Sequence, residues 1–571
     1  MGAVRMLLPL LRAATGRDGR RPGGRLLAVA LLRCASPRWT LVRPKPLERR
    51  LVWSEEAVSV GRAAVVRARP GAPGLLARSL GLHAQLLVQT DRYEEALAAA
   101  EGSLSVPESH ASSRQIAFCH LMRTFALAWL DRPDEAVVAA RRSVAGYRSA
   151  VPRRADRYLG STAAALRAQA WVLGRAGRTA ESVTVYFECA ELMRALPLWQ
   201  QARLVVLEFR VLAELTGGLR VLGRFGEAVE VGDSAGERIA PFVARLYPEA
   251  RLLGAGLLID LAWCIGVTGD LPRARATAEE AVARCRALRG NDDPVVGESL
   301  LALALDCLAH HLDRLDAHAE ERAVCEELVV IGERLAVTAP DVHEPGLAAA
   351  LDSLAHCRAR DGEGHAAVAA GERCVELYRR AVRRDPSLYE TELARTLANL
   401  SVRLRVTGDF GGAVAAAGEA LSITRRLAES GGEAQRSAVA GRLSVLGRAR
   451  YGAEDDEGSA ACFEEAETLL RELMAADDPG PYEDGLAAAQ SGLAKALGAA
   501  ADGHLDAGRA DAAVTVLRRM MELTGRTTLT DVHAECVSAF ARARDRDPEG
   551  VRQSWRRATG EPWPTFVYRA G

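Results

Sequence analysis

Lysine and asparagine are almost missing from this chain of 571 residues. Only Lys45 and Lys495 are lysines among the 74 basic residues, so arginine supplies nearly all of the positive charge. This usage is typical of a GC-rich genome and says nothing about mechanism. With 49% hydrophobic and 26% charged residues, the composition is that of an ordinary globular protein and excludes a disordered chain.

A net positive charge is also missing outside the first 50 residues. Those residues hold twelve Arg or Lys against Asp18 and Glu48, a charge of +10, so the remaining 62 basic and 72 acidic residues leave the body at −10. Because phosphate binding needs a basic face, we expect no nucleic-acid binding by the body of the protein. Residues 1–50 are expected to form a basic extension, partly disordered or helical.

Paired cysteines and long apolar segments are absent as well. The eleven cysteines contain no C-x-x-C pair, which argues against a disulfide framework or a zinc site and favours reduced thiols in a cytoplasm. The apolar run Leu26–Leu32 has seven residues, too short to span a bilayer, and Arg33 follows it where a signal peptide needs a small residue. We therefore expect a cytoplasmic protein with no transmembrane segment.

The sequence lacks the motifs on which common enzyme chemistry depends. It has no G-x-x-x-x-G-K-[ST] phosphate loop, no G-x-S-x-G nucleophile elbow and no H-E-x-x-H zinc helix. Gly254 and Gly256 begin a G-x-G match, but Ile259 stands at the third glycine position within a helical segment. The expectation is a protein without catalytic residues, cofactor or metal.

The sequence does contain an internal repeat. Segments 218–235, 256–288 and 396–429 each show an apolar helical run, a turn with glycine, and a second run with a small residue near its start. We call that small residue the marker. The markers are Ala57, Ala96, Ala136, Ser182, Ala228, Ala274, Glu321, Ala367, Ala413, Ser459 and Ala513. Most successive markers are 46 or 47 residues apart, so chance similarity is a poor explanation.

The apolar spacing within each repeat is helical. Leu400 and Leu404 are four residues apart on the first run, and Ala413, Ala417 and Ala420 follow one face of the second. Neither helix can bury its apolar face alone, so each hairpin must pack on its neighbours. Small residues seven positions after the marker would allow close approach: Ser143, Cys189, Ala235, Ala281, Cys374, Ala420 and Ala466. We predict an all-α solenoid of about ten antiparallel helix hairpins.

This pattern resembles the tetratricopeptide repeat, whose small, turn-glycine, aromatic and small positions are matched by Ser401, Gly408, Phe410, Ala413 and Ala420. The resemblance covers residues 52 to 530, and Glu321, Gly364 and Asp456 depart from it. It implies a right-handed superhelix with a partner-binding groove. The period of 46 exceeds the usual ~34 residues and resembles long arrays found in actinobacterial regulatory and NTPase-associated proteins.

We accordingly divide the chain into the extension 1–50, a repeat array 51–530, and a C-terminal part 531–571. The last part is expected to hold an amphipathic helix over 530–546 and a short helix over 549–558. Trp563 and Phe566 then either cover the exposed end of the core or serve as a docking segment, and the first interpretation is favoured because terminal repeats must be sealed.

The face of the first helices is the candidate partner-binding groove. Eleven residues before the marker, successive repeats carry Gln85, Phe125, Trp171, Gly217, Trp263, His310, His356 and Val402. Two tryptophans and two histidines at one repeated position suggest a shared surface. The alternative is that Trp171 and Trp263 pack in the core, as aromatic residues at helical spacing often do.

Two Asp-His-Arg rows stand on neighbouring first helices. Asp306, His310 and Arg314 recur 46 residues later as Asp352, His356 and Arg360, with Asp260 at a related position in the preceding repeat. Side chains four and eight residues apart share one side of a helix, so the arginines could grip a peptide carboxylate. Simple intrahelical ion pairs are the alternative, and a metal site made from His310, His311, His356, Cys307 and Cys357 is a third.

Asn399, one of two asparagines, falls where the resemblance implies contact with a bound peptide backbone. The matching positions in other repeats carry other residues, so a shared asparagine clamp is absent.

Two functions are compatible with these observations. The first is a non-enzymatic scaffold or regulatory adaptor that binds a peptide or protein segment in the groove. The alternative is a ligand- or peptide-responsive sensor that regulates an effector such as a transcription factor or an NTPase. The basic extension, at about 50 residues, is too short for an NTPase domain and marginal for a DNA-reading domain.

Overall fold

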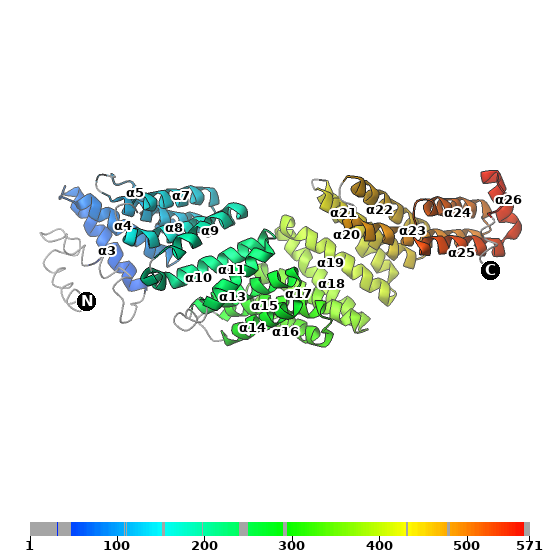
Figure 1. Ribbon diagram of the computed structural model, residues 1–571, viewed down its shortest axis with the longest axis horizontal. Coiled ribbons are helices and arrows are strands. Elements are labelled where there is room, and N and C mark those ends of the chain that lie inside the picture. The colour runs from blue at the N-terminus through cyan, green and yellow to red at the C-terminus, as the bar shows by residue number, and fades with distance from the viewer. Residues whose placement is uncertain are drawn as a thin grey trace. The chain divides into compact units, whose positions relative to one another are not determined.

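The computed structural model describes residues 31, 47–107, 109, 111–150, 155–196, 198–238, 249–288, 294–429, 432–476 and 480–564. These residues form 23 α-helices and one short 3₁₀ helix, with no strand in the described ranges (Figure 1). Most of the basic extension, including all of the run Leu26–Leu32 except Leu31, and Phe566 of the tail lie outside them. The all-α prediction is confirmed.

The chain divides into two compact units, residues 1–307 and 308–571, and each is described by itself. The helices of the first unit are α3 Leu47–Val66, α4 Ala72–Val88, α5 Tyr93–Leu104, α6 Ser113–Trp129, α7 Pro133–Ala150, α8 Ala155–Arg175, α9 Thr179–Arg194, α10 Leu198–Val221, α11 Phe225–Arg238, α13 Glu249–Thr268 and α14 Leu271–Ala287. Helix α15, Pro294–Arg314, contains the boundary.

The second unit continues with further long helices. They are α16 His318–Thr338, α17 Pro340–Arg360, α18 Gly364–Arg384, α19 Pro386–Thr407, α20 Phe410–Ala428, α21 Glu433–Gly452, α22 Asp456–Ala476, η4 Gly480–Tyr482, α23 Glu483–Asp506, α24 Ala510–Thr524, α25 Thr530–Arg546 and α26 Pro548–Thr559. Helices α16 to α22 have 19 to 22 residues each, and this length accounts for the long period.

The described helices from α4 to α24 pair into ten hairpins, each a first and a second helix joined by a tight turn. Every turn has one residue with positive φ, five positions before the marker. Glycine, the residue that takes this conformation without steric cost, stands there in six hairpins. The other four use Asp91, Asp131, Asp316 and Glu454, at φ between 55° and 61°. All ten hairpins therefore share the same turn geometry, although only six of them have glycine at the residue with positive φ.

The markers from Ala96 onward are the fourth residue of each second helix, and all eleven markers are buried. Ala57 differs in its place, since it lies in the middle of α3. The small residues seven positions later are buried as well. Two of these residues donate a hydrogen bond to a backbone carbonyl of the preceding first helix. Ser143 Oγ donates to Ala117 at 2.8 Å, and Cys189 Sγ donates to Ala163 at 3.2 Å. These contacts hold the two helices close together, as predicted from their size.

Successive second helices are also joined by a row of exposed ion pairs. The residue twelve positions after one marker meets the residue six positions after the next, as in Arg379 with Glu419 and Arg425 with Glu465, both at 2.5 Å. Glu333 and Arg373 make the same contact at 2.7 Å with the signs reversed. Each exposed pair contributes up to about 1 kcal/mol to the free energy of unfolding. The main effect of the row is therefore to favour one alignment of neighbouring second helices.

The last hairpin is covered by α25, α26 and the segment after them. Trp563 packs on Phe540 of α25 and Trp555 of α26, with ring centroids 5.2 and 5.6 Å apart. All three rings are buried within the same core cluster as Leu517 and Met520 of α24. The described part of the tail thus lies over the end of the repeat core.

Two helices are long and apolar enough to cross a membrane by length and composition alone. They are the windows Arg251–Thr268 in α13 and Val295–Arg314 in α15, with 56% and 50% of their residues buried in the protein. Both are first helices of stacked hairpins, and a buried core helix passes the same test. The finding is weak evidence for a membrane and is explained by the repeat core.

Candidate partner-binding site

The residues eleven positions before the markers share a partly exposed face of the first helices. His310, His356 and Val402 are exposed, while Phe125, Trp171 and Trp263 are half-buried. Trp171 packs at the edge of a core cluster that includes Leu173 and Ala136. Trp171 therefore combines core packing with a surface position.

In the first unit, an aromatic cluster forms around Trp171. Its ring centroid lies 5.9 Å from both Phe125 and Trp129 of α6, and Trp129 stacks on Tyr93 of α5 at 5.6 Å and 14°. The Arg175 guanidinium lies 5.1 Å from the Trp129 ring and 5.6 Å from the Trp171 ring. We call Tyr93, Phe125, Trp129, Trp171 and Arg175 the aromatic patch.

The aromatic patch is a surface feature, because Trp129 is 50% exposed. A large ring that keeps half of its area in water, beside a stacked guanidinium, can add a further aromatic, aliphatic or cationic group with little rearrangement. The Tyr93 hydroxyl donates a hydrogen bond to Asp91 at 2.5 Å, and this bond raises the pKa of the hydroxyl to about 12. The patch can bind a flat or apolar side chain.

Sequence reasoning found Trp171 and Phe125 but missed Trp129, Tyr93 and Arg175. The missing signal was a second repeated position: Trp129 and Arg175 each stand seven residues before a marker, one helical turn after the position considered. Tyr93, three before its marker, contacts that position in the next repeat. Comparing these two positions across repeats would have identified the patch.

Asp260 lies on α13, half-buried against α10. Its Oδ1 accepts a hydrogen bond from Arg220 Nε at 2.7 Å. Burial raises the pKa of the Asp260 carboxyl, and the nearby Arg220 charge opposes that shift. A Cβ at Gly217 would come within 3.0 Å of Asp260 Oδ2, so glycine leaves room for this carboxylate.

In the second unit, Asp352 is the centre of a polar network with α19. Its Oδ1 accepts from Arg403 Nη1 at 2.8 Å, and its Oδ2 accepts from Arg395 Nη1 at 2.7 Å and Asn399 Nδ2 at 3.0 Å. Asp352 and Arg403 are 6% and 8% exposed. Burial alone would raise the pKa of Asp352, but Arg403 and Arg395 lower it overall. Two predicted site residues, Asp352 and Asn399, are thus brought together, and the asparagine amide bonds the aspartate.

His356 and Arg360 contact a different carboxylate from the one sequence spacing suggested. Arg360 Nη1 donates to Asp313 of α15 at 3.2 Å, and its Nη2 donates to Glu321 of α16. His356 is exposed, with Nε2 3.9 Å from Asp313. Asp352 pairs instead with arginines of the following repeat, which reach it across the helix interface. Asp352, His356 and Arg360 therefore divide between two networks.

The equivalent residues of α15 occupy one helix as predicted. Asp306 is half-buried, and His310 and Arg314 are exposed. The imidazoles of His310 and buried His311 meet edge to face at 5.5 Å. Asp306 belongs to the first unit, and the other two residues belong to the second.

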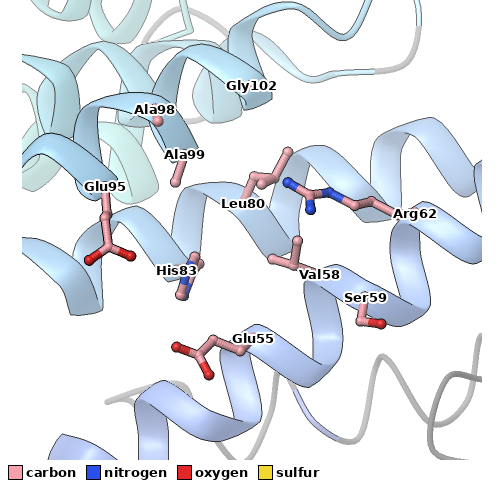
Figure 2. Close-up of a pocket in the computed structure, with 10 residues that line it drawn as sticks. All are labelled: Glu55, Val58, Ser59, Arg62, Leu80, His83, Glu95, Ala98, Ala99 and Gly102. Carbon is pink, nitrogen blue, oxygen red and sulfur yellow. The ribbon is translucent and has the colours of Figure 1, made fainter.

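Two open cavities lie in the first unit. One, of about 450 Å³, lies among α3, α4 and α5, where Figure 2 shows Glu55, His83 and Glu95 grouped apart from Arg62. His83 Nδ1 is 2.9 Å from Ser54 Oγ. Arg92 reaches both carboxylates, at 3.9 Å from Glu55 and 2.7 Å from Glu95, and offsets one of their two negative charges.

The second cavity, of about 410 Å³, is basic. It is lined by residues of α5, α6 and α7 that include Glu101, His120, Arg123 and Arg142. Arg123 Nε lies 3.2 Å from Glu101, and His120 Nδ1 is buried with no hydrogen-bond partner. Burial first, and then the two arginines, lower the pKa of His120 to about 4. With two arginines against one glutamate, this cavity can accept a small anion.

Comparisons with known proteins give matches among solved structures alone. No protein-family model matches the sequence, and no curated protein matches it. The chain is similar to the apo form of RapI at 10% identity, over 70% of this chain and 98% of that one, with a TM-score of 0.45. It is also similar to a Rap protein complexed with competence and sporulation factor, at 12% identity, over 71% of this chain and 100% of that one, with a TM-score of 0.38. A third similar structure is a signal transduction ATPase with a tetratricopeptide repeat sensor, from Pyrococcus horikoshii. The identity is 13%, the match covers 66% of this chain and 55% of that one, and the TM-score is 0.43.

Proposed function

We propose that this protein is a non-enzymatic scaffold or regulatory adaptor that binds a peptide or protein segment along its first helices. The observation that supports this best is the aromatic patch, where Trp129 is half exposed beside Trp171 and Arg175. Tryptophan, tyrosine and arginine are the residues enriched at the energetic centres of protein interfaces. Three of these types meet here on successive repeats.

The geometry of the patch suggests what the bound segment contains. The rings of Trp129 and Trp171 meet at 48° and leave an edge to which an aromatic or long aliphatic side chain can add. Arg175, held over both rings, can pair with a carboxylate of the same segment. The favoured ligand is a segment with an apolar anchor followed by an acidic residue.

The test is affinity capture from the native host, followed by mass spectrometry, with wild type and two variants. Trp129→Ala combined with Trp171→Ala is expected to lose the specific partner, with at least a tenfold weaker Kd when the partner is titrated. Val138→Ala on the second helix α7 is the matched control, because Val138 is also 50% exposed. Equal capture by all three proteins would remove the aromatic patch from the binding site.

The Asp-His-Arg rows give a second, independent variant. Arg314 is exposed, and its change to Ala is expected to weaken partner binding if the second unit takes part in it. Arg360→Ala is a less clean variant because Arg360 also neutralises buried Glu321. Unchanged affinity after Arg314→Ala, with the fold retained, would restrict the site to the first unit.

The basic cavity favours a second candidate function, a sensor that binds a small anion or an acidic peptide terminus and then controls an effector. His120, Arg123 and Arg142 supply the recognition groups. A melting-temperature screen against small anions separates the two functions, since a ligand of the native state raises the melting temperature by mass action. A cytoplasmic location is part of both proposals, supported by ten free, buried cysteines among the described residues.

A further inference from the structure

The marker position of the repeat around α16 holds a buried charge. Ten of the eleven markers are alanine or serine, whereas this one is Glu321, which is 4% exposed. Two buried thiols meet it: Cys325 lies one turn further along α16, and Cys357 projects from α17. A carboxylate and two cysteines therefore replace small or apolar packing at one junction between hairpins.

The three side chains converge on a common point. Cys357 Sγ lies 3.2 Å from Glu321 Oε1 and 3.9 Å from Cys325 Sγ, and all three donor atoms lie within 4.8 Å of one another. In a tetrahedral zinc site, bond lengths of about 2.3 Å to sulfur and 2.0 Å to oxygen place neighbouring donors roughly 3.5 to 3.8 Å apart. The two separations from Cys357 Sγ, 3.2 and 3.9 Å, are close to these donor-to-donor distances, so small side-chain rotations would bring the three atoms into a coordination shell.

A fourth candidate donor lies beside the carboxylate, outside the group of three donor atoms that lie within 4.8 Å of one another. His318 Nδ1, one turn before Glu321 on α16, is 3.9 Å from Glu321 Oε2 and has no hydrogen-bond partner. Imidazole nitrogen, thiolate and carboxylate oxygen are the ligand types that zinc selects in proteins.

The charges also match a divalent cation. Two thiolates and one carboxylate carry −3, a bound cation adds +2, and the guanidinium of Arg360, which donates to Glu321 Oε2, adds +1. The three ligands, the cation and Arg360 then sum to zero, and Asp313, the second partner of Arg360, lies on the more exposed side of that guanidinium. Arg360 would orient the ligating carboxylate from outside the coordination shell, as second partners of metal ligands commonly do.

We propose that Glu321, Cys325 and Cys357, with His318 as the fourth ligand, form a site for a thiophilic divalent cation of the zinc type. The cation displaces the thiol protons to solvent and bonds the two sulfurs. Because α16 closes one hairpin and α17 opens the next, the site would join consecutive repeats of the second unit. It differs from the alternative metal set considered from the sequence, His310, His311, His356, Cys307 and Cys357, because Cys307 Sγ lies against the Ile259 carbonyl at 3.8 Å.

The probe is Co²⁺, added without oxygen to the full chain after reduction and treatment with a chelator. One equivalent is expected to produce a thiolate-to-cobalt charge-transfer band and tetrahedral d–d bands, both removed by one equivalent of Zn²⁺. Zn²⁺ should also raise the melting temperature of the wild type. A folded, reduced wild-type protein that shows no such bands would overturn the proposal.

Variants assign the ligands. Cys325→Ser combined with Cys357→Ser should abolish the charge-transfer band, and Glu321→Gln should weaken Co²⁺ binding about tenfold or more while keeping sulfur ligation. Cys374→Ser is the matched control, since Cys374 is buried in α18 at a position where other repeats carry serine. Bands that survive the double change would overturn the assignment, as would a Cys325–Cys357 disulfide found in protein that binds no metal once reduced.

Discussion

His120 is the residue whose protonation is most clearly altered by folding. Its folded pKa of about 4 lies below the ordinary value near 6.5. Between these two pH values the imidazole is protonated in the unfolded chain and neutral in the folded protein. The neutral imidazole therefore contributes stability that is present above pH 6.5 and is lost as the pH falls toward 4. After allowance for its partial exposure, we expect a loss of about 1 to 2 kcal/mol between pH 7 and pH 5.

The measurement is urea unfolding at pH 7 and pH 5 for the wild type and His120→Gln. The variant lacks the titrating group, so its loss over this interval should be smaller than that of the wild type by the same 1 to 2 kcal/mol, on the order set by the pKa shift. The carboxylates titrate equally in both proteins and cancel. Identical losses would show that His120 does not resist protonation in the folded state.

The turn residues allow a test of backbone strain. Glu454 has φ of 61°, a left-handed conformation that costs an ordinary residue about 1 to 2 kcal/mol. Changing Glu454 to Gly removes that strain but adds freedom to the unfolded chain, so we expect a net stabilisation of about 0.5 to 1 kcal/mol. The reverse change, Gly408→Ala at φ of 88°, should destabilise by about 1 kcal/mol or more. The measurement is the urea unfolding midpoint, which should rise for Glu454→Gly and fall for Gly408→Ala relative to the wild type.

At the scale of the helix, the network around Asp352 links α17 to α19. Arg403 and Asp352 are both buried, so removal of the aspartate leaves a guanidinium charge without compensation. Asp352→Ala is expected to cost about 3 to 5 kcal/mol. Arg425→Ala, at an exposed pair with Glu465, should cost less than about 1 kcal/mol and serves as the control. Comparable losses in the two variants would mean that burial does not strengthen the Asp352 network.

The helices and their pairing were predictable from sequence because one rule acts at every repeat. An apolar face must be covered at a fixed spacing, and the marker Ala413 with its turn residue Gly408 reports that rule directly. Acidic turn residues such as Asp131 follow from the common geometry even though composition does not reveal them. The spacing of apolar residues was therefore sufficient to predict the helices and their pairing into hairpins.

The candidate site was predictable only in part. Trp171 and Asn399 were found by position, but the partners of Asp352 are residues 43 to 51 positions later that reach it across a helix interface. Such contacts depend on how two helices are rotated and offset, which apolar spacing does not specify. Glu321 illustrates the same point, because a departure from the pattern became interpretable only once Cys325 and Cys357 were seen beside it.

On the scale of the whole molecule, repeat proteins are stabilised mainly by contacts between neighbours. Trp563 is 6% exposed over the last hairpin, and Trp563→Ala should cost roughly 3 kcal/mol at that end. Hydrogen exchange is expected to accelerate in α24, α25 and α26 while the amides of α16 to α18 keep their protection. Faster exchange throughout the second unit would instead indicate one cooperative block.

The exposed ion pairs between second helices determine which repeats could be copied in tandem. The repeat marked by Ala413 carries Glu419 and Arg425, so a duplicate inserted beside it would meet opposite charges at the new seam. The repeat marked by Glu321 carries Glu327 and Glu333 at the same two places, and its duplicate would set two carboxylates against each other. Lengthening this protein by gene duplication is therefore electrostatically permitted at some repeats and opposed at others.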